Sequence, residues 1–179
     1  AFWLRPSGHD LVLSIPAAAK SPPEETEARL LERIRSPGWR YRSSSGRASL
    51  AGDGDPDTQW VVEDTIRGGE SMEIGFGGES VRIAAVALPL TRREILPTGF
   101  QVEIRDGEGG WRPFSSYGAL ERDELIAHLL KTPGRAMLTL AGEEAVATGV
   151  RLVADSNARS FDGWRLGEVE VLVRASGLK

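Results

Sequence analysis

Three aspartates fall within five residues of one another, at Asp53, Asp55 and Asp57, in a loop that also contains Thr58 and ends at Trp60. Carboxylates this close repel one another unless a cation or a basic neighbour compensates their charge. Calcium is one such cation, since it takes about six to eight oxygen ligands from carboxylates, hydroxyls and backbone carbonyls. The spacing does not make an EF-hand, because its sixth position is Thr58 instead of glycine and the flanking helices are missing.

Basic residues that precede this loop offer a second explanation for the aspartates. No acidic residue lies between Glu32 and Asp53, whereas that interval is rich in arginine. Its arginines are Arg33, Arg35, Arg40, Arg42 and Arg47. Salt bridges between these arginines and the loop would balance the charge without a metal ion, so the residues alone leave both interpretations open.

The residue types that most often carry catalysis are scarce. The sequence has no cysteine, which excludes disulfides, thiolate nucleophiles and cysteine metal sites. Its two histidines, His9 and His128, lie far apart, so we discount a zinc enzyme and a histidine-based triad. No segment resembles a nucleophile elbow or a phosphate-binding loop. We therefore expect a non-catalytic protein.

Length and composition favour one turn-rich domain with an appendage. The 179 residues include 21 glycines and 10 prolines, which suits many turns between short strands. The formal net charge of −4 argues against a general nucleic-acid partner. The longest apolar run, residues 83–90, is far shorter than the roughly 20 residues that a membrane-spanning helix needs. The start at Ala1, without a signal-peptide pattern, predicts a piece of a longer protein.

Residues 1–38 are predicted to form an N-terminal extension with a short strand over 11–15 and a helix after it. Ser21 and Glu24 have the spacing of a capping box, and residues 36–38 end the helix with a proline and a glycine. The apolar stripe of this helix is expected to contain Ala28, Leu30, Leu31 and Ile34.

From Trp39 onward the apolar residues recur with a period of about 2 instead of about 3.6. The clearest strand covers 100–105, where Phe100, Val102 and Ile104 alternate with polar residues. The run 81–88 is apolar at nearly every position, as is typical of a central strand. Further alternating segments lie at 72–76, 150–152 and 169–173. With turns rich in glycine between them, these segments predict an all-β antiparallel sandwich.

One helix is predicted to interrupt the strands at about 121–131. Its buried stripe is expected to contain Leu125, Ile126, Leu129 and Leu130, and the helix ends at Thr132-Pro133-Gly134. His128 lies on this helix, and we expect it to be structural instead of a ligand.

The segment from Asp53 to Trp60 has the pattern Asp-Gly-Asp-Pro-x-Thr-x-Trp. With this pattern and the strand segments after it, the sequence resembles the discoidin or coagulation factor 5/8 type C domains, including related carbohydrate-binding modules. The similar segments are 71–77, 81–89, 100–107 followed by Trp111, 149–153 and 167–171. The resemblance covers about residues 39–173 and implies that residues 39–175 form an eight-stranded jelly-roll β-sandwich of the galactose-binding-like kind. It also implies that Trp60 points inward.

In calcium-binding members of this family, the aspartate loop and a glutamate of the last strand share one ion. The matching residues are Asp53, Asp55, Thr58, Gly167 and Glu168, with Gly167 offering a backbone carbonyl. The alternation agrees in part, since Glu168 points away from the face of Val169 and Val171. The calcium ion that the resemblance implies would be structural, and would join the first loop to the last strand.

Carbohydrate recognition needs polar groups that bind hydroxyls in pairs and an aromatic face for the sugar ring. The connection 155–164 contains both kinds of residue, and the loops after Trp60 and after the central strand would lie at the same end of a sandwich of this family. The candidate ligand-binding residues are Arg67, Arg92, Arg93, Asn157, Arg159, Phe161 and Trp164.

The resemblance therefore implies a non-catalytic carbohydrate-binding module of a larger extracytoplasmic or cell-envelope protein, with a glycan or polysaccharide as its partner. The alternative is an interaction or scaffolding domain of the same fold, which positions other domains of its parent protein and binds no sugar. Exposure of Phe161 and Trp164 on one concave end would favour the sugar, and burial of both would favour scaffolding.

Overall fold

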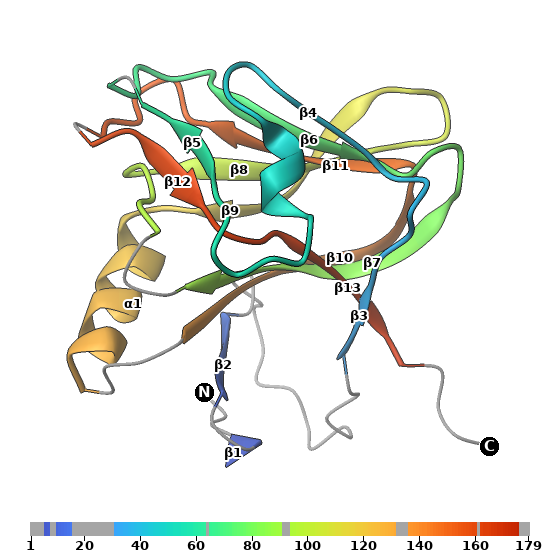
Figure 1. The fold of residues 1–179 in the computed structure, drawn as a ribbon. Helices are drawn as coiled ribbons and strands as arrows, with labels where there is room; N and C mark the ends of the chain where they lie inside the picture. Colours follow the sequence, from blue (N-terminus) through green and yellow to red (C-terminus); the bar gives the residue numbers. More distant parts are fainter. Residues whose placement is uncertain are drawn as a thin grey trace.

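The computed structural model describes residues 6–7, 10–15, 31–63, 65–90, 94–131, 136–160 and 162–175. Two large sheets face one another across an apolar core (Figure 1). The six-stranded sheet has the order β1 (Pro6–Ser7), β2 (Asp10–Ile15), β10 (Ala136–Ala147), β7 (Val81–Leu90), β13 (Glu170–Arg174), β3 (Leu31–Ile34). The five-stranded sheet has the order β4 (Arg40–Ser43), β6 (Ser71–Gly75), β11 (Gly149–Ala154), β8 (Phe100–Arg105), β9 (Trp111–Tyr117).

Three smaller elements complete the fold. β5 (Trp60–Val62) pairs with β12 (Trp164–Leu166) as a two-stranded sheet. A short 3-10 helix, η1 (Ala48–Ala51), precedes β5, and the helix α1 (Ala119–Lys131) follows β9. The neighbouring strands are antiparallel except for β2 and β10, which are parallel. The prediction of an all-β sandwich with one inserted helix is confirmed, although the described residues form more strands than the eight expected.

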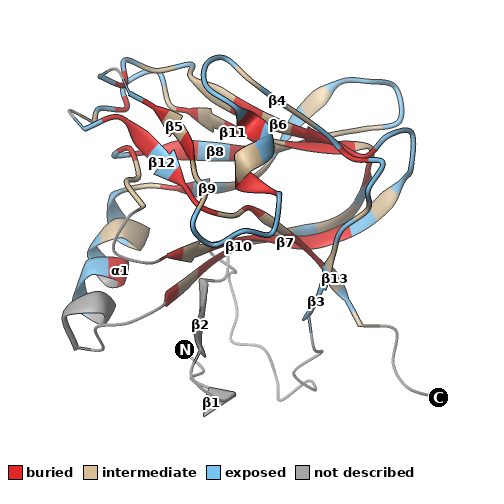
Figure 2. Ribbon diagram, viewed as in Figure 1, coloured by how far each residue is buried: buried red, intermediate tan, exposed pale blue. Residues whose placement is uncertain are grey.

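The core lies between the inner faces of the two large sheets, as Figure 2 shows in red. In β8 the predicted alternation is confirmed, since Phe100, Val102 and Ile104 are buried while Gln101 is exposed. Trp60 is fully buried, and its Nε1 donates a hydrogen bond of 2.8 Å to the carbonyl oxygen of Ser45. The inward position expected for this tryptophan is confirmed.

The N-terminal segment departs from the prediction at its end. The helix expected after Ser21 lies mostly outside the described residues, but its last residues, Leu31–Ile34, form the strand β3. β3 pairs with β13, and Arg33 Nη1 lies 2.6 Å from Glu170 Oε1 across this pair. The helix prediction is wrong here, because the edge of β13 offers the backbone partners that outweigh a local helical preference. The strand expected at 11–15 is present as β2.

Helix α1 covers the predicted helix and begins two residues earlier. The carboxylate of Glu121 accepts a hydrogen bond of 3.0 Å from the backbone N–H of Gly118, which stabilises the helix start. Leu125 is buried as expected, but Ile126 is 48% exposed, so its place in the buried stripe is wrong. The side chains of Leu129, Leu130 and His128 lie outside the described residues. Within the described part of the chain, no helix is both long and apolar enough to cross a membrane.

Candidate functional site

A pocket of about 730 Å³ lies where two loops meet the outer face of the five-stranded sheet. One loop joins β5 to β6 and the other joins β11 to β12, and they run close together in Figure 1. The strands β8 and β11 contribute the remaining surface. The lining residues are Gly68, Gly69, Gln101, Glu103, Val153, Ala154, Asp155, Ser156 and Asn157.

Backbone contacts hold the two loops against each other. The N–H of Gly69 donates to the carbonyl of Ala154 at 2.9 Å, and Ile66 forms an isolated β-bridge with Ser160. Gly68 has a φ of +103°, and a Cβ at this position would lie 2.6 Å from the carbonyl oxygen of Asp155. Glycine is therefore required for this close approach of the two loops.

Glu70 fixes the conformation of the first loop. Its two carboxylate oxygens accept hydrogen bonds from the N–H groups of Arg67 at 3.1 Å and Gly68 at 2.9 Å. Burial alone raises the pKa of Glu70, but these backbone donors and the charge of Arg67 together lower it by more, so the pKa lies below the ordinary value. The loop conformation is thus linked to the ionised form of Glu70.

Two carboxylates line the pocket in different environments. Glu103 receives two hydrogen bonds from Arg151, which lies opposite it on β11. Asp155 has one oxygen, Oδ1, that is shielded from solvent and accepts no hydrogen bond from the described residues. Its other oxygen lies 2.5 Å from the position that a Cβ on Gly99 would take, so the absence of a side chain at Gly99 makes room for the carboxylate.

Three predicted ligand-binding residues come together at this end of the sandwich. Asn157 is exposed and lines the pocket, while Arg67 and Arg159 are exposed residues of the two loops that contribute to it. Arg159 Nη1 donates to the carbonyl oxygens of Ala158 at 2.6 Å and of Arg67 at 3.4 Å. The guanidinium of Arg159 therefore braces the second loop against the first.

The prediction for Trp164 is wrong. Its side chain is fully buried, 5.2 Å from the ring of Trp60 and 5.4 Å from the ring of Phe100 between centroids. Burial of an indole in a shared aromatic cluster stabilises the fold and leaves no face for a sugar. Arg92, Arg93 and Phe161 lie outside the described residues.

Several pocket residues were not predicted from the sequence. They are Gly68, Gly69, Gln101, Glu103, Val153, Ala154, Asp155 and Ser156. Gln101 and Glu103 are the water-facing positions of a strand whose alternation was recognised, and Asp155 begins the connection chosen for its polar residues. The sequence therefore showed that these residues face water. It did not show which loop lies beside them, because that depends on the pairing of β8 with β11.

The aspartate loop brings several oxygens to one point. Thr58 Oγ1 lies 2.9 Å from each carboxylate oxygen of Asp53, 3.1 Å from the carbonyl of Asp55 and 3.3 Å from that of Leu50. One hydroxyl hydrogen cannot serve four acceptors at once. Glu168 joins the same loop, because its Oε1 accepts a hydrogen bond of 2.7 Å from the N–H of Gly54. This is the donor set that a hard cation prefers.

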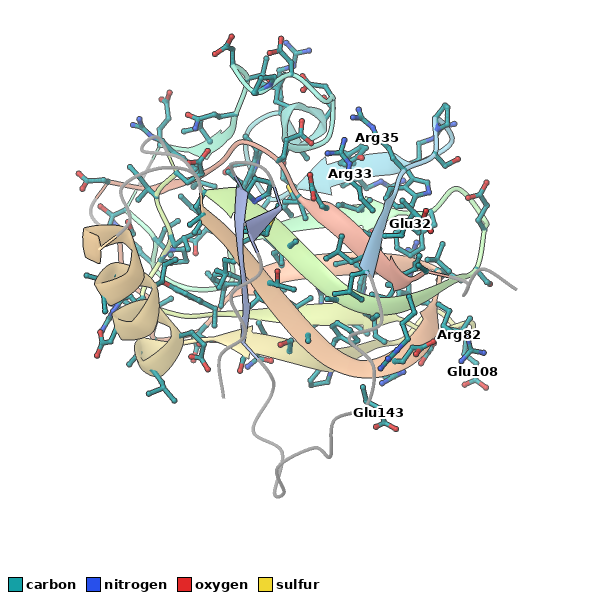
Figure 3. The ribbon with its side chains drawn as sticks, turned by 90° about the horizontal axis from the view of Figure 1, so that it is seen from below. Glu32, Arg33, Arg35, Arg82, Glu108 and Glu143 are labelled. Carbon is teal, nitrogen blue, oxygen red and sulfur yellow. The ribbon has the colours of Figure 1, made fainter. Side chains whose placement is uncertain are left out.

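The arginines before the aspartate loop take different places, and the guanidinium of Arg35 lies against Gly54 of this loop. Figure 3 shows Arg33 and Arg35 near each other, yet Arg33 pairs with Glu170, and in the described part of the chain no arginine pairs with Asp53 or Asp55. Burial raises the pKa of Glu168, while the N–H of Gly54 and the charge of Arg35 oppose the shift. No three His, Cys, Asp or Glu side chains of the described residues gather tightly enough to hold a metal by themselves. A cation here would need the hydroxyl and the carbonyls.

Comparisons with known proteins give likenesses of structure alone, since no family model and no curated protein matches the sequence. The family 32 carbohydrate-binding module of Clostridium perfringens NanJ, solved with galactose, has a TM-score of 0.60 at 12% identity, covering 80% of this chain and all of that one. A chitosan-binding module from a Paenibacillus chitosanase/glucanase has a TM-score of 0.55 at 17% identity, covering 75% of this chain and 94% of that one.

A third structure, truncated AlyQ, contains a family 32 module and an alginate lyase domain in one chain. Its TM-score is 0.59 at 11% identity, and the match covers 83% of this chain and 35% of that one. These likenesses show that this chain has the galactose-binding-like β-sandwich fold of the family 32 modules. The fold expected from the resemblance to discoidin domains is confirmed.

Proposed function

We propose that this chain is a non-catalytic carbohydrate-binding module whose ligand site is the pocket between the two loops and the outer face of β8 and β11. The pocket carries the proposal. Its volume of about 730 Å³ suits a small ligand. It presents the amides of Gln101 and Asn157 and the carboxylate of Asp155, which are the groups that pair with sugar hydroxyls. The solved proteins of the same fold include modules described as binding galactose and chitosan.

A glycan array and affinity electrophoresis test this proposal. The parent protein is compared with Asn157→Ala, which removes one amide from the pocket, and with Glu108→Ala. Glu108 is exposed in the turn between β8 and β9, at the far end of β8 from the pocket, and serves as the matched control. We expect binding by the parent and the control and a loss of about tenfold or more in Asn157→Ala. Silence of a folded parent across the array would contradict a sugar site.

The same proposal includes a structural calcium ion in the aspartate loop. The oxygens of Asp53 and Thr58 and the carbonyls of Leu50 and Asp55 come together here, and Glu168 contacts Gly54 of the same loop; oxygen ligands of these kinds suit this ion. Calcium would compensate the carboxylates and join the loop to the segment before β13. It would supply no chemistry to the pocket, which different loops form.

Thermal melts in calcium and in chelator test the ion. We expect calcium to raise the Tm of the parent and of Glu108→Gln, and to leave the Tm of Thr58→Val unchanged, because that substitution removes the central hydroxyl. Equal calcium shifts in the parent and in Thr58→Val would count against the site.

We also propose that the module belongs to a larger extracytoplasmic protein. Support comes from the AlyQ chain, in which a module of this fold is joined to a lyase domain. Fractionation of cells that express the full parent protein tests the location, and a cytoplasmic pool alone would contradict it.

One observation favours the alternative of a docking domain. Leu120 and Ile126 of α1 are 69% and 48% exposed, and Trp164 is buried and offers no aromatic platform. If a folded parent binds no glycan, this helix is the surface on which to look for a partner domain.

A further inference from the structure

Arginine side chains gather on the outer face of the five-stranded sheet, on the side of its edge strand β4. Directly paired residues of neighbouring strands point to the same face, so the pairing shows which side chains face outward. One row contains Arg40, Gly75, Gly149 and Arg105, and the next row contains Arg42, Glu73, Arg151 and Glu103. The two rows thus hold four arginines and two glutamates, in a chain whose formal net charge is −4.

The glutamates of these rows are paired with arginines that lie away from the edge. Glu73 lies 3.3 Å from Arg105, and the other glutamate pairs with the arginine beside it on β11. Arg42 is the direct partner of Glu73 on β4, yet neither Arg40 nor Arg42 forms an ion pair with a described residue. Both arginines are exposed, so two guanidiniums at this edge carry positive charge that no carboxylate of the face balances.

Two glycines bring the guanidinium of Arg105 towards the same edge. A Cβ on Gly75 or on Gly149 would lie 3.2 Å from Nη2 of Arg105, so this guanidinium lies over β6 and β11. It donates to the hydroxyl and the carbonyl of Thr148 and to Glu73, which restrains it. These bonds use three of the five N–H groups of a guanidinium. A restrained guanidinium with spare donors therefore lies over the strand next to β4.

The neighbouring acidic residues belong to other surfaces. Asp106 and Glu108 lie in the turn from β8 to β9, and β9 is the opposite edge of the sheet from β4. The Oδ1 of Asp106 accepts hydrogen bonds from the N–H groups of Glu108 at 3.0 Å and Gly110 at 2.9 Å, which holds it within that turn. The aspartate loop contacts β4 from the inner side, where Gly52 packs against the ring of Tyr41.

From this arrangement we propose that the β4 side of the outer face binds a sulfated polysaccharide, as a second surface separate from the pocket. The planar fork of guanidinium donors matches the oxygens of an anionic group. A sulfate ester has three terminal oxygens that point in different directions, so one sulfate can contact guanidiniums of two strands, such as Arg40 and Arg105. The two oxygens of a carboxylate lie in one plane and suit a single guanidinium better.

The same face is less suited to a single-stranded nucleic acid. Such ligands combine charge with bases that stack on aromatic rings. Trp111, the aromatic residue of this face, lies under the guanidiniums of Arg151 and Arg105, at 4.5 Å and 5.4 Å from the ring centroid. Its ring is therefore not free for a base, and a polysaccharide is the polyanion that the surface fits.

The first experiment compares polymers that share one backbone. Affinity electrophoresis of the parent protein uses dextran, carboxymethyl-dextran and dextran sulfate, the last two at equal charge density, with a single-stranded oligonucleotide as the fourth probe. We expect dextran sulfate to bind about fivefold or more tightly than carboxymethyl-dextran, dextran to leave the mobility unchanged, and added salt to weaken the binding. Absence of binding to dextran sulfate, equal binding of the two charged dextrans, or tighter binding of the oligonucleotide would overturn the inference.

The second experiment locates the surface with matched variants. Arg40→Gln and Arg42→Gln each remove a guanidinium that has no ion-pair partner among the described residues, so thermal melts should show folded proteins. We expect dextran sulfate binding to weaken about threefold in each and about tenfold in the double variant. Arg165→Gln removes the same charge from an exposed position on β12, outside the five-stranded sheet, and should bind as the parent does. Equal losses in Arg165→Gln and the β4 variants would reveal unspecific attraction and overturn the inference.

The two proposals can fail separately, because they concern different surfaces. Asn157→Ala, which changes the pocket, should leave dextran sulfate binding unchanged, and the β4 variants should leave binding on the glycan array to neutral sugars unchanged. A loss of dextran sulfate binding in Asn157→Ala would place the anionic ligand in the pocket and contradict a second surface.

Discussion

Arg151 donates hydrogen bonds from both Nε and Nη2 to a single oxygen of Glu103, with Nε at 2.8 Å. The two residues are direct partners in the pairing of β11 with β8. Trp111 covers the same guanidinium, and Arg105 lies 5.4 Å from the centroid of that ring and pairs with Glu73 at 3.3 Å. The outer face of the five-stranded sheet is therefore an ordered array of charged side chains that leads into the pocket.

Removing Arg151 should destabilise the protein through the partner that it leaves behind. In Arg151→Met the half-buried Glu103 keeps its charge and loses both donors, so we expect the free energy of unfolding to fall by about 1–3 kcal/mol. The double variant Arg151→Met, Glu103→Gln should recover part of this loss. Urea denaturation of the parent, both single variants and the double variant measures the coupling, and additive losses would contradict it.

Two glycines in the wall of the pocket allow the strain of a positive φ to be distinguished from a clash between the two loops. Gly68→Ala and Gly69→Ala share the strain of a positive φ, at +103° and +87°, but only the Cβ at Gly68 meets the second loop, because the space around Gly69 is open. We expect Gly69→Ala to lose about 1 kcal/mol of stability from backbone strain, and Gly68→Ala to lose more, because its Cβ also overlaps backbone atoms of the second loop, and to lose glycan binding in addition. Equal binding by the two variants would show that the contact between the loops does not shape the site.

Acid should loosen the first loop through Glu70. The pKa of Glu70 is lower in the folded protein than its ordinary value of 4.5, so its contribution to stability is present above pH 4.5 and is lost as the pH falls through the folded pKa. Glu70→Gln should therefore be less stable than the parent at neutral pH, and the difference should shrink in acid. Denaturation curves measured at several pH values check this, and a difference that is constant with pH would contradict it.

Both tyrosines of the chain should ionise above their ordinary pH in the folded protein. Burial raises the pKa of Tyr117 to about 12, against the opposing charge of Arg122, and burial also raises the pKa of Tyr41. The stability that Tyr117 contributes is present below pH 10.0 and is lost as the pH rises towards about 12. Ultraviolet titration should show no tyrosine that ionises at its ordinary pH in the folded protein. The variant Tyr117→Phe should lack one ionisation step, which shows the pH at which Tyr117 ionises in the parent.

Trp164 should prove essential to the fold and indifferent to the ligand. Trp164→Ala opens a cavity beside Trp60 and Phe100 and should cost about 3–5 kcal/mol. Trp164→Phe keeps an aromatic ring in the cluster, so a folded sample should bind glycan as the parent does. A selective loss of binding in folded Trp164→Phe would return this residue to the site.

Several strands and the interior of the sandwich were predictable because alternation reports burial directly. Phe100, Val102 and Ile104 face the core as their spacing indicates, and the loop from Asp53 to Trp60 carried the resemblance that named the fold. Residues 31–34 were wrongly predicted to be helical, because the strand that they pair with is distant in the sequence. Arg33 and Glu170, which join the two strands, are 137 residues apart, and no local pattern of residues reveals such a partner.

The candidate site was predicted only in part for a related reason. Asn157, Arg67 and Arg159 were predicted because they lie in loops rich in polar residues, and the structure places all three at one end of the sandwich. Trp164 was misplaced because an aromatic residue in a polar connection looks the same in sequence whether it faces a ligand or the core. Gln101 and Glu103 were overlooked because a water-facing strand position becomes part of a site only through the loop above it.

The pairing of β3 with β13 also determines when this protein can fold. Residues 31–34 have their partners at 171–174, near the other end of the chain, and β13 itself lies between β7 and β3. A ribosome must therefore synthesise nearly all of this domain before the six-stranded sheet can close, and until then the edges of β3 and β7 lack the strand that separates them. Such long-range closure slows folding and prolongs the exposure of unpaired edges. Expression of the intact domain should thus depend on chaperones that shield those edges until β13 leaves the ribosome.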